Sequence, residues 1–292
     1  MRITDDSNYR NLLLDIQRIA ERMQNAQSQV SSGKRLNRPS DDASASADVV
    51  SIDAERATNA QYLDNAASAQ SRLEVADNAL DGVQLVIERI RSLGQLAQSG
   101  NTPSATSTYE INQLRDQILS AANTVFEGQS IFAGSKTDGA AYVKAGNGTV
   151  SYSGDSMVTK LQTGRATSIQ SQIPGDQIFS GSIDIFQTIT DLMNAINTGD
   201  KAGIQTGVTN LGTLSQTVSS VRTQVGGLIN SAAAAQSDLR QTELTQVAQL
   251  SRLRDADLSR ALSDFSQSQI ALQAATAVGA RVSSISLLDY LK

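Results

Sequence analysis

Apolar residues recur at intervals of three and four near both ends of the chain. The N-terminal stripe comprises Tyr9, Leu13, Ile16, Ala20, Met23 and Val30, with Gln27 as its one polar member. The C-terminal stripe comprises Leu258, Ala261, Phe265, Leu272, Ala275, Gly279 and Val282. This spacing is typical of helices that pair along a narrow seam. Such a stripe needs a partner, so the pattern predicts that the two ends pair with each other or with another molecule.

The same spacing predicts three helices in the first half of the chain. The first runs from about residue 8 to residue 32 and stops at Gly33, a residue suited to a helix C-terminus. A basic turn over residues 34–39 follows, and Ser40, Asp41 and Asp42 start a long second helix that ends at residues 99–100. The third helix carries apolar residues from 111 to 125 and is closed by Gly128.

The helical spacing of apolar residues is lost between residues 134 and 181, where Gly, Ser and Thr are frequent. Asn147 and Gly148 lie between short alternating runs at 141–143 and 149–152, which predicts a β-hairpin. A second turn at Gly154 and Asp155 precedes a further extended run over residues 157–161. These features predict a small β-rich insertion.

Helical spacing returns at residues 185–196 and breaks at 198–200. The last predicted helix is very long, with a phase slip near residues 241–249, and it continues to the C-terminus. The predicted fold class is therefore mainly α: a long antiparallel helical rod or coiled coil formed by the N- and C-terminal segments, with a small β-rich middle domain. The predicted domains are terminal coiled-coil segments at 1–40 and 251–292, a helical core at 41–135 and 182–250, and a β-rich surface domain at 136–181.

Composition narrows the range of functions. Aromatic residues make up 4% of the chain, and Trp, Cys and His are all absent. These absences argue against a disulfide framework, a thiolate metal site and the usual neutral-pH general base. The net charge of −5 and the lack of a basic face argue against a nucleic-acid partner. The polar N-terminus does not resemble a cleaved secretory signal, and no apolar run approaches the length of a membrane span.

The candidate chemical motifs are weak. Ser31 and Lys34 match S-x-x-K, which occurs in serine acyl-enzymes, but the companion motifs are missing. The acidic pairs at 5–6, 41–42 and 255/257 lack the spacing of a calcium loop and are better explained as helix caps and solvated faces. We therefore predict no catalytic, cofactor-binding or metal-binding residues, and no enzyme activity.

Three stretches resemble a known family. Residues 31–42 (SSGKRLNRPSDD), 255–257 (DAD) and 286–291 (SLLDYL) are similar to the turn and the closing helix of bacterial flagellins and their relatives. Within that family, residues 1–4 with Tyr9, the form of the turn at 39–42, residues 131–137 (IFAGSKT) and residues 175–179 (GDQIF) are similar to the proteins of the hook–filament junction. Ala43 departs from the pattern, because Pro is frequent there in junction proteins.

The resemblance implies a structural role in the flagellum. It implies a helical core with a surface β-domain, and terminal segments that are poorly ordered in the monomer and pair as a coiled coil in the assembled tube. It also implies an extracellular location, reached by flagellar type III export without a cleaved signal. The implied partners are further copies of the chain, hook-associated protein 1 on the hook side, flagellin on the filament side, and an export chaperone and export gate.

The predicted assembly interface combines both stripes. Its residues are Tyr9, Leu13, Ile16, Ala20, Met23, Val30, Leu258, Phe265, Leu272, Val282 and Leu288.

Three alternatives remain open at this point. The nearest is a short flagellin that forms the filament itself, because flagellins share the terminal helices and the basic turn. The second is an acyl-transferring hydrolase that uses Ser31 and Lys34. The third is a coiled-coil export factor, in which the β-rich insertion would have no obvious purpose.

Overall fold

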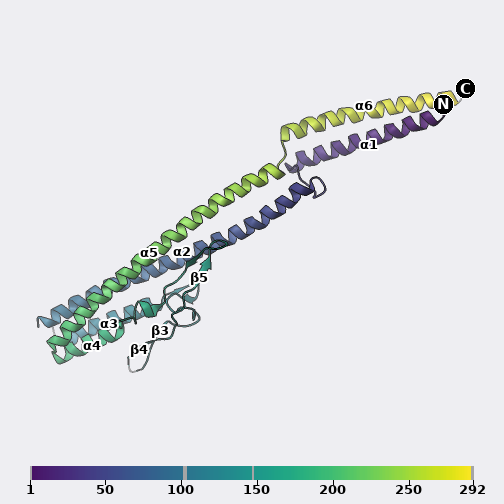
Figure 1. The fold of residues 1–292 in the computed structure, drawn as a ribbon. Coiled ribbons are helices and arrows are strands. Elements are labelled where there is room, and N and C mark those ends of the chain that lie inside the picture. The colour runs from purple at the N-terminus through teal and green to yellow at the C-terminus, as the bar shows by residue number, and fades with distance from the viewer. Residues whose placement is uncertain (1, 101–103, 147, 291–292) are drawn as a thin grey trace. The chain divides into compact units, whose positions relative to one another are not determined.

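The computed structural model describes residues 2–100, 104–146 and 148–290 (Figure 1). Its helices are α1 (Arg2–Ser32), α2 (Ala43–Gln98), α3 (Ser104–Ala122), α4 (Ile185–Thr198), α5 (Lys201–Arg254) and α6 (Leu258–Tyr290). Its strands are β1 (Val125–Phe126), β2 (Gln129–Ser130), β3 (Tyr142–Lys144), β4 (Val150–Tyr152), β5 (Lys160–Gln162) and β6 (Ser168–Gln170), and Gly175–Gln177 forms a 3-10 turn. The mainly helical fold with a small β-rich middle is confirmed.

Local sequence explains most helix ends. Gly33 and Gly199 end α1 and α4 with φ of 69° and 71°, the left-handed region that glycine adopts without steric cost. Asp42 and Asp184 begin α2 and α4, because their carboxylates accept hydrogen bonds from the amides of Ala45 and Gln187. These ends agree with the sequence prediction.

Two helix predictions are wrong. The third helix ends at Ala122, and Val125 instead starts a β-hairpin whose turn residues Glu127 and Gly128 have φ of 52° and 78°. The last helix does not continue to the C-terminus, because residues 255–257 interrupt it. An apolar residue at helical spacing is therefore not sufficient evidence of a helix where a turn follows immediately.

The β-rich segment consists of three antiparallel two-stranded sheets, β1–β2, β3–β4 and β5–β6. The predicted hairpin is confirmed by β3 and β4, in which Tyr142 pairs with Tyr152 and Lys144 with Val150. Asn147 lies outside the described residues. The predicted run at 157–161 is extended only at its end, since β5 begins at Lys160.

The chain forms two compact units, residues 58–241 and residues 1–57 with 242–292. The unit of residues 58–241 contains a continuous apolar core, to which α2, α3, α4 and α5 all contribute fully buried side chains. Its fully buried members include Leu73, Leu80, Ile87, Ile90, Ile111, Ile118, Ile189, Leu192, Leu211 and Val225. The three-part division predicted from sequence stays a prediction.

An aromatic cluster extends this core into the β-rich segment. The ring of Phe179 packs edge-on against those of Phe132 and Tyr142, with ring centroids 5.5 Å apart in each pair. Burial is the main cause that raises the pKa of the Tyr142 hydroxyl. Burial is also the main cause that raises the pKa of Tyr152, to about 12. The helical and β-rich parts of this unit therefore share one interior.

Residues 131–137, one of the motifs behind the family resemblance, join these two parts through their backbone. The carbonyl of Phe132 accepts hydrogen bonds from the amide of Gly175 (2.7 Å) and the hydroxyl of Tyr152 (2.9 Å). The carbonyl of Gly134 accepts one from the side-chain amide of Gln172 (2.6 Å), which is 1% exposed. Gly134 has φ of 68°, and a Cβ there would collide with the backbone of Asp155. The backbone of residues 131–137 therefore holds the helical and β-rich parts of this unit together.

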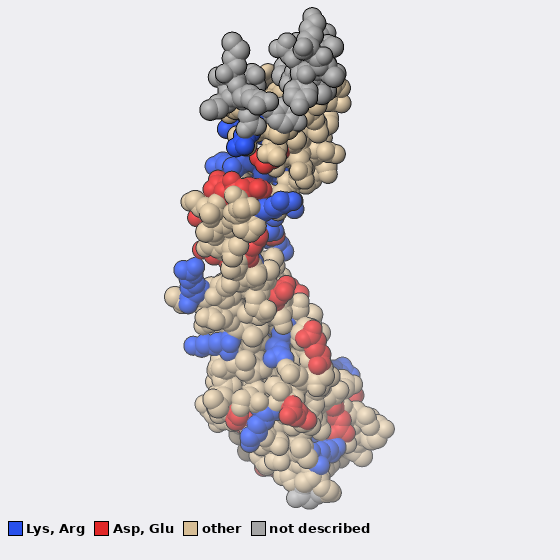
Figure 2. Space-filling view, turned by 90° about the vertical axis from the view of Figure 1, so that its right-hand side faces the viewer, with Lys and Arg blue, Asp and Glu red and all other residues tan. Residues whose placement is uncertain are grey.

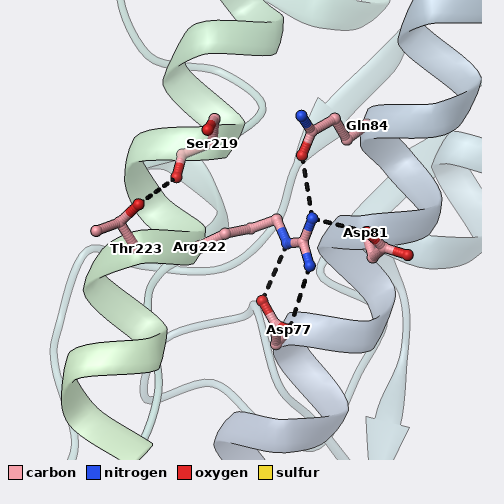
Figure 3. Close-up of polar contacts among 6 residues, drawn as sticks. All are labelled: Asp77, Asp81, Gln84, Ser219, Arg222 and Thr223. Carbon is pink, nitrogen blue, oxygen red and sulfur yellow. Dashed lines mark hydrogen bonds and ion pairs between the residues drawn. The ribbon is translucent and has the colours of Figure 1, made fainter.

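A polar contact ties α2 to α5 in the same unit (Figure 3). The guanidinium of Arg222 on α5 lies 3.0 Å from Asp77 and 2.7 Å from Asp81, both on α2, and donates a 3.2 Å hydrogen bond to Gln84. The hydrogen bond to Asp77 is the main cause that raises the pKa of Arg222. Since the side chain is 28% exposed, solvent screens this cluster only in part.

Lys and Arg side chains alternate with Asp and Glu side chains on the face shown in Figure 2, with no broad area of one sign among the residues it colours. Of the helices in the described ranges, none combines the length and apolar character that crossing a membrane requires.

Candidate assembly surface

Helices α1 and α6 lie side by side and run antiparallel (Figure 1). At one end of the pair the amide of Ala256 donates a 2.9 Å hydrogen bond to the carbonyl of Gly33. Further along, a Cβ added to Gly279 would lie 3.4 Å from a methyl group of Leu12. The two ends of the chain therefore pair with each other, which was one of the two possibilities that the apolar stripes predicted.

The contact seam keeps a regular four–three spacing on both helices. The partly or fully buried positions at this spacing are Leu12, Ile16, Ile19, Met23, Ala26 and Val30 on α1, and Ala261, Phe265, Ser268, Leu272, Ala275 and Gly279 on α6. Ala20, Gln29 and Ala271 are also partly buried and lie beside this seam. Ala26 and Ala261 are the fully buried members, at 6% and 2% exposure. Small residues at these positions let the helices approach closely.

Most of the predicted interface residues with described side chains lie in or beside this seam. Ile16, Ala20, Met23, Val30, Phe265 and Leu272 are partly buried. Leu13 and Leu258 remain 43% and 49% exposed. The side chains of Tyr9, Val282 and Leu288 lie outside the described residues.

Sequence reasoning missed Leu12, Ile19 and Ala26. The predicted stripe and the observed seam share Ile16, Met23 and Val30, so the two differ by a small rotation about the helix axis. The available signal was Gln27: the observed seam places Ala26 where the predicted stripe required this polar residue. On α1, the stripe with no polar member therefore matches the observed seam better, whereas the seam of α6 does include a polar residue, Ser268.

The terminal pair also presents apolar side chains away from its own seam. These are Leu13, Leu14, Leu258, Leu262, Ile270 and Val278, which are between 43% and 65% exposed. Residues 265–280 of α6 carry no charged side chain, whereas α1 has five between residues 10 and 22. Exposed apolar side chains on the uncharged stretch of α6, such as Ile270 and Val278, are ones that contact with a neighbouring molecule would bury.

The basic turn after α1 is held by its own carboxylates. Asp41 accepts hydrogen bonds from the amides of Asn37 (3.0 Å) and Arg38 (2.9 Å). The hydrogen bond from the Ala45 amide lowers the pKa of Asp42, and an ion pair with Arg35 adds to this effect. Asp41 therefore closes the turn and Asp42 caps α2, of which only the second is the helix-cap role that the sequence favoured.

Ser31 and Lys34, the candidate acyl-transfer pair, belong to the same turn. Ser31 is exposed in the last turn of α1, and the backbone amide of Lys34 donates a 3.1 Å hydrogen bond to the hydroxyl of Ser32. The geometry thus gives both residues places at a helix end.

Comparison with known proteins agrees with this architecture. The N-terminal helical region of bacterial flagellin matches residues 3–137, and its C-terminal helical region matches residues 208–291. The chain belongs to the bacterial flagellin family. Both matched regions contain part of the terminal pair, so the family resemblance predicted from sequence is confirmed.

Both a hook-associated protein and a flagellin are similar to this chain. Flagellar hook-associated protein 3 of Escherichia coli is 27% identical over 90% of this chain and 91% of its own length. A flagellin of Bacillus subtilis is 24% identical over 85% of each chain. The crystal structure of the flagellar junction protein FlgL from Legionella pneumophila superposes with a TM-score of 0.58 at 16% identity, over 71% of this chain and all of that one. The last likeness concerns the fold.

Proposed function

We propose that this protein is a structural adaptor of the bacterial flagellum, at the junction between hook and filament. Its terminal helix pair would pack against neighbouring subunits, with hook-associated protein 1 on one side and flagellin on the other. The observation that carries the proposal is the exposed apolar surface of α1 and α6, on a chain of the flagellin family whose similarity to a hook-associated protein 3 extends over 90% of its length.

The energetics of the terminal pair support assembly. A two-helix seam with few fully buried residues contributes little stability alone. Burying the exposed leucine, isoleucine and valine side chains against neighbours would stabilise the complex by about 0.8 kcal/mol for each buried methylene group, before ordering costs. Ordering of the ends is then coupled to assembly, as the family resemblance implies. We infer the same export route as for similar flagellar proteins, through the type III channel with its chaperone and gate.

A short flagellin is the second candidate, because a flagellin is also similar to this chain. Deletion of the gene distinguishes the two. Bare hooks in electron micrographs, with flagellin released into the culture medium, are expected for a junction adaptor. Intact filaments would contradict the proposal and favour a dispensable flagellin.

Phe265→Asp tests the interface directly. The charge would lie in the α1–α6 seam, where Phe265 is partly buried, so we expect loss of incorporation into flagella. Ser263→Asp adds the same charge at an exposed position of α6 outside the uncharged stretch of residues 265–280 and serves as the control. Equal incorporation of both variants would show that the seam is not needed for assembly.

A further inference from the structure

Arg115 on α3 has an almost completely buried side chain. It is 9% exposed, whereas the side chains of Arg89, Arg91 and Arg222 are between 28% and 54% exposed. Each of those three guanidinium groups donates a hydrogen bond to a carboxylate. Within the part of the chain that the structure describes, the buried Nε of Arg115 has no hydrogen-bond partner. Since burying a charged group without partners is unfavourable, this guanidinium can gain from an acceptor outside the chain.

The neighbouring carboxylate does not complete this guanidinium. The Nη2 atom of Arg115 lies 3.8 Å from Oδ1 of Asp116, which is too long for a hydrogen bond. Adjacent residues of a helix point in different directions, so Asp116 cannot face Arg115 while α3 is intact. The same Oδ1 atom accepts a 2.7 Å hydrogen bond from the ammonium group of Lys144 on β3. Two cations therefore share one carboxylate, and one positive charge is left without compensation.

The position of Lys144 is fixed by the core of this unit. The side-chain amide of Asn123, just after α3, donates to the carbonyl of Tyr142 and accepts from its backbone amide, both at 2.8 Å. The ring of Tyr142 is buried in the aromatic cluster. Lys144 follows two residues later on the same strand. The two cations therefore belong to the unit of residues 58–241 and are held without help from the terminal helices.

A carboxylate is the ligand that fits this arrangement. A guanidinium presents its N–H groups in a planar fork that matches the two oxygens of a carboxylate. The single negative charge of a carboxylate balances the uncompensated positive charge, whereas a doubly charged phosphate would exceed it and be repelled by Asp116. Because Arg115 is reachable only at its outer atoms, the slim end of an Asp or Glu side chain suits the site.

We propose that Arg115 and Lys144 bind a carboxylate, and that an acidic side chain of a neighbouring copy of this chain supplies it in the assembled flagellum. The chain has 29 acidic residues against 24 basic ones, so a second copy presents many such groups. The site itself does not depend on the proposed function. Its occupant rests on that function, because assembly is what brings copies of the chain together.

Titration of the full-length monomer with sodium acetate tests the site. The readout is the nitrogen NMR resonance of the Arg115 Nε atom, identified by its loss in Arg115→Lys. We expect a shift of this resonance that saturates in the millimolar range of acetate, and no such shift with sodium chloride at the same ionic strength. A shift that does not saturate, or an equal shift with chloride, would overturn the proposal.

Three variants separate the site from net charge. Lys144→Met removes the partly exposed second cation and should weaken acetate binding about threefold. Lys160→Met removes the same charge at an exposed position of β5 and should bind acetate like the wild type. Asp116→Asn removes the competing carboxylate and should strengthen acetate binding about threefold. Equal weakening in both lysine variants, or weaker binding in Asp116→Asn, would contradict the assignment.

Incorporation into flagella tests the occupant. Lys144→Glu places a carboxylate of the chain's own in the site, so we expect less of this variant in purified flagella than of Lys160→Glu, the matched control. Equal incorporation would overturn the neighbouring copy as the occupant and leave a small free carboxylate as the ligand. If the wild type is not incorporated, the proposed function and the occupant both fail, while the acetate titration still decides the site.

Discussion

The unit of residues 58–241 and the terminal helix pair use apolar residues in opposite ways. In the former, side chains such as Leu80, Ile87 and Phe132 are completely buried within one chain. In the latter, only Ala26 and Ala261 are fully buried among the described side chains of α1 and α6, while Ile270 is 65% exposed. The first unit buries its apolar side chains within one chain, whereas the terminal pair leaves several of its own exposed.

The largest difference in stability between the two units is expected when a phenylalanine is removed from each. Phe132→Ala removes a fully buried ring from the aromatic cluster, so we expect a loss of about 3–5 kcal/mol in the free energy of unfolding of the monomer. Phe265→Ala removes a partly buried ring from the two-helix seam, and a loss below about 1 kcal/mol is expected from the same denaturant titration. Equal losses would mean that the terminal pair is as firmly packed as the core.

Two glycines with nearly the same φ provide the next test. Gly134→Ala would bring a methyl group into the backbone of Asp155, and we expect about 3 kcal/mol of destabilisation. Gly33→Ala faces open space, so only the left-handed conformation is penalised, by about 1 kcal/mol. Thermal unfolding of both variants measures the difference. A larger effect at Gly33 would contradict this assignment.

Removing the Arg222 contact is expected to cause an intermediate loss of stability. Arg222→Ala leaves Asp77 without its bidentate partner between α2 and α5, and a loss of about 1–3 kcal/mol in unfolding free energy is expected. The neighbouring Thr223→Ala is the matched control, because its hydroxyl donates only to the carbonyl of Ser219 in the same helix. If both variants unfold alike, the ionic contact does not stabilise the packing of these helices.

Alkaline pH is expected to lower the stability of the unit of residues 58–241. The folded pKa of Tyr152 is raised from 10.0 to about 12, so the folded state holds this proton more tightly than the unfolded state. The stability of the unit of residues 58–241 should therefore be fully present below pH 10 and decrease as the pH rises toward 12. Tyr152→Phe should weaken this dependence. A stability independent of pH in this range would contradict the burial of the hydroxyl.

Lowering the pH is expected to have the smallest effect, a loss of stability in the first turn of α2 in the terminal unit. Because hydrogen bonding lowers the pKa of Asp42 below 3.8, its capping contribution is present above that value and disappears as the pH falls through the folded pKa. Asp42→Asn, which still caps but does not titrate, should remove the dependence. Amide exchange in the first turn of α2, followed between pH 5 and pH 2, provides the measurement.

Much of this molecule follows from sequence alone. Helical spacing, Gly33, Gly199 and the aspartates at residues 41, 42 and 184 determine the helices and most of their ends, because each acts on atoms within a few residues. The hairpin around Gly148 follows from the same local logic. The family resemblance also depended on short motifs, and the matches to flagellin helical regions confirm it.

The tertiary structure decided what depends on residues distant in the chain. Spacing placed Leu13 and Leu258 in the same stripes as Ile16 and Phe265, but only helix pairing showed that Leu12, Ile19 and Ala26 complete the seam. The period of residues 246–261 is compatible with one continuous helix, and the interruption at 255–257 appears where the N-terminal turn supplies partners for its backbone. These contacts link residues that lie far apart in the sequence, so no local pattern determines them.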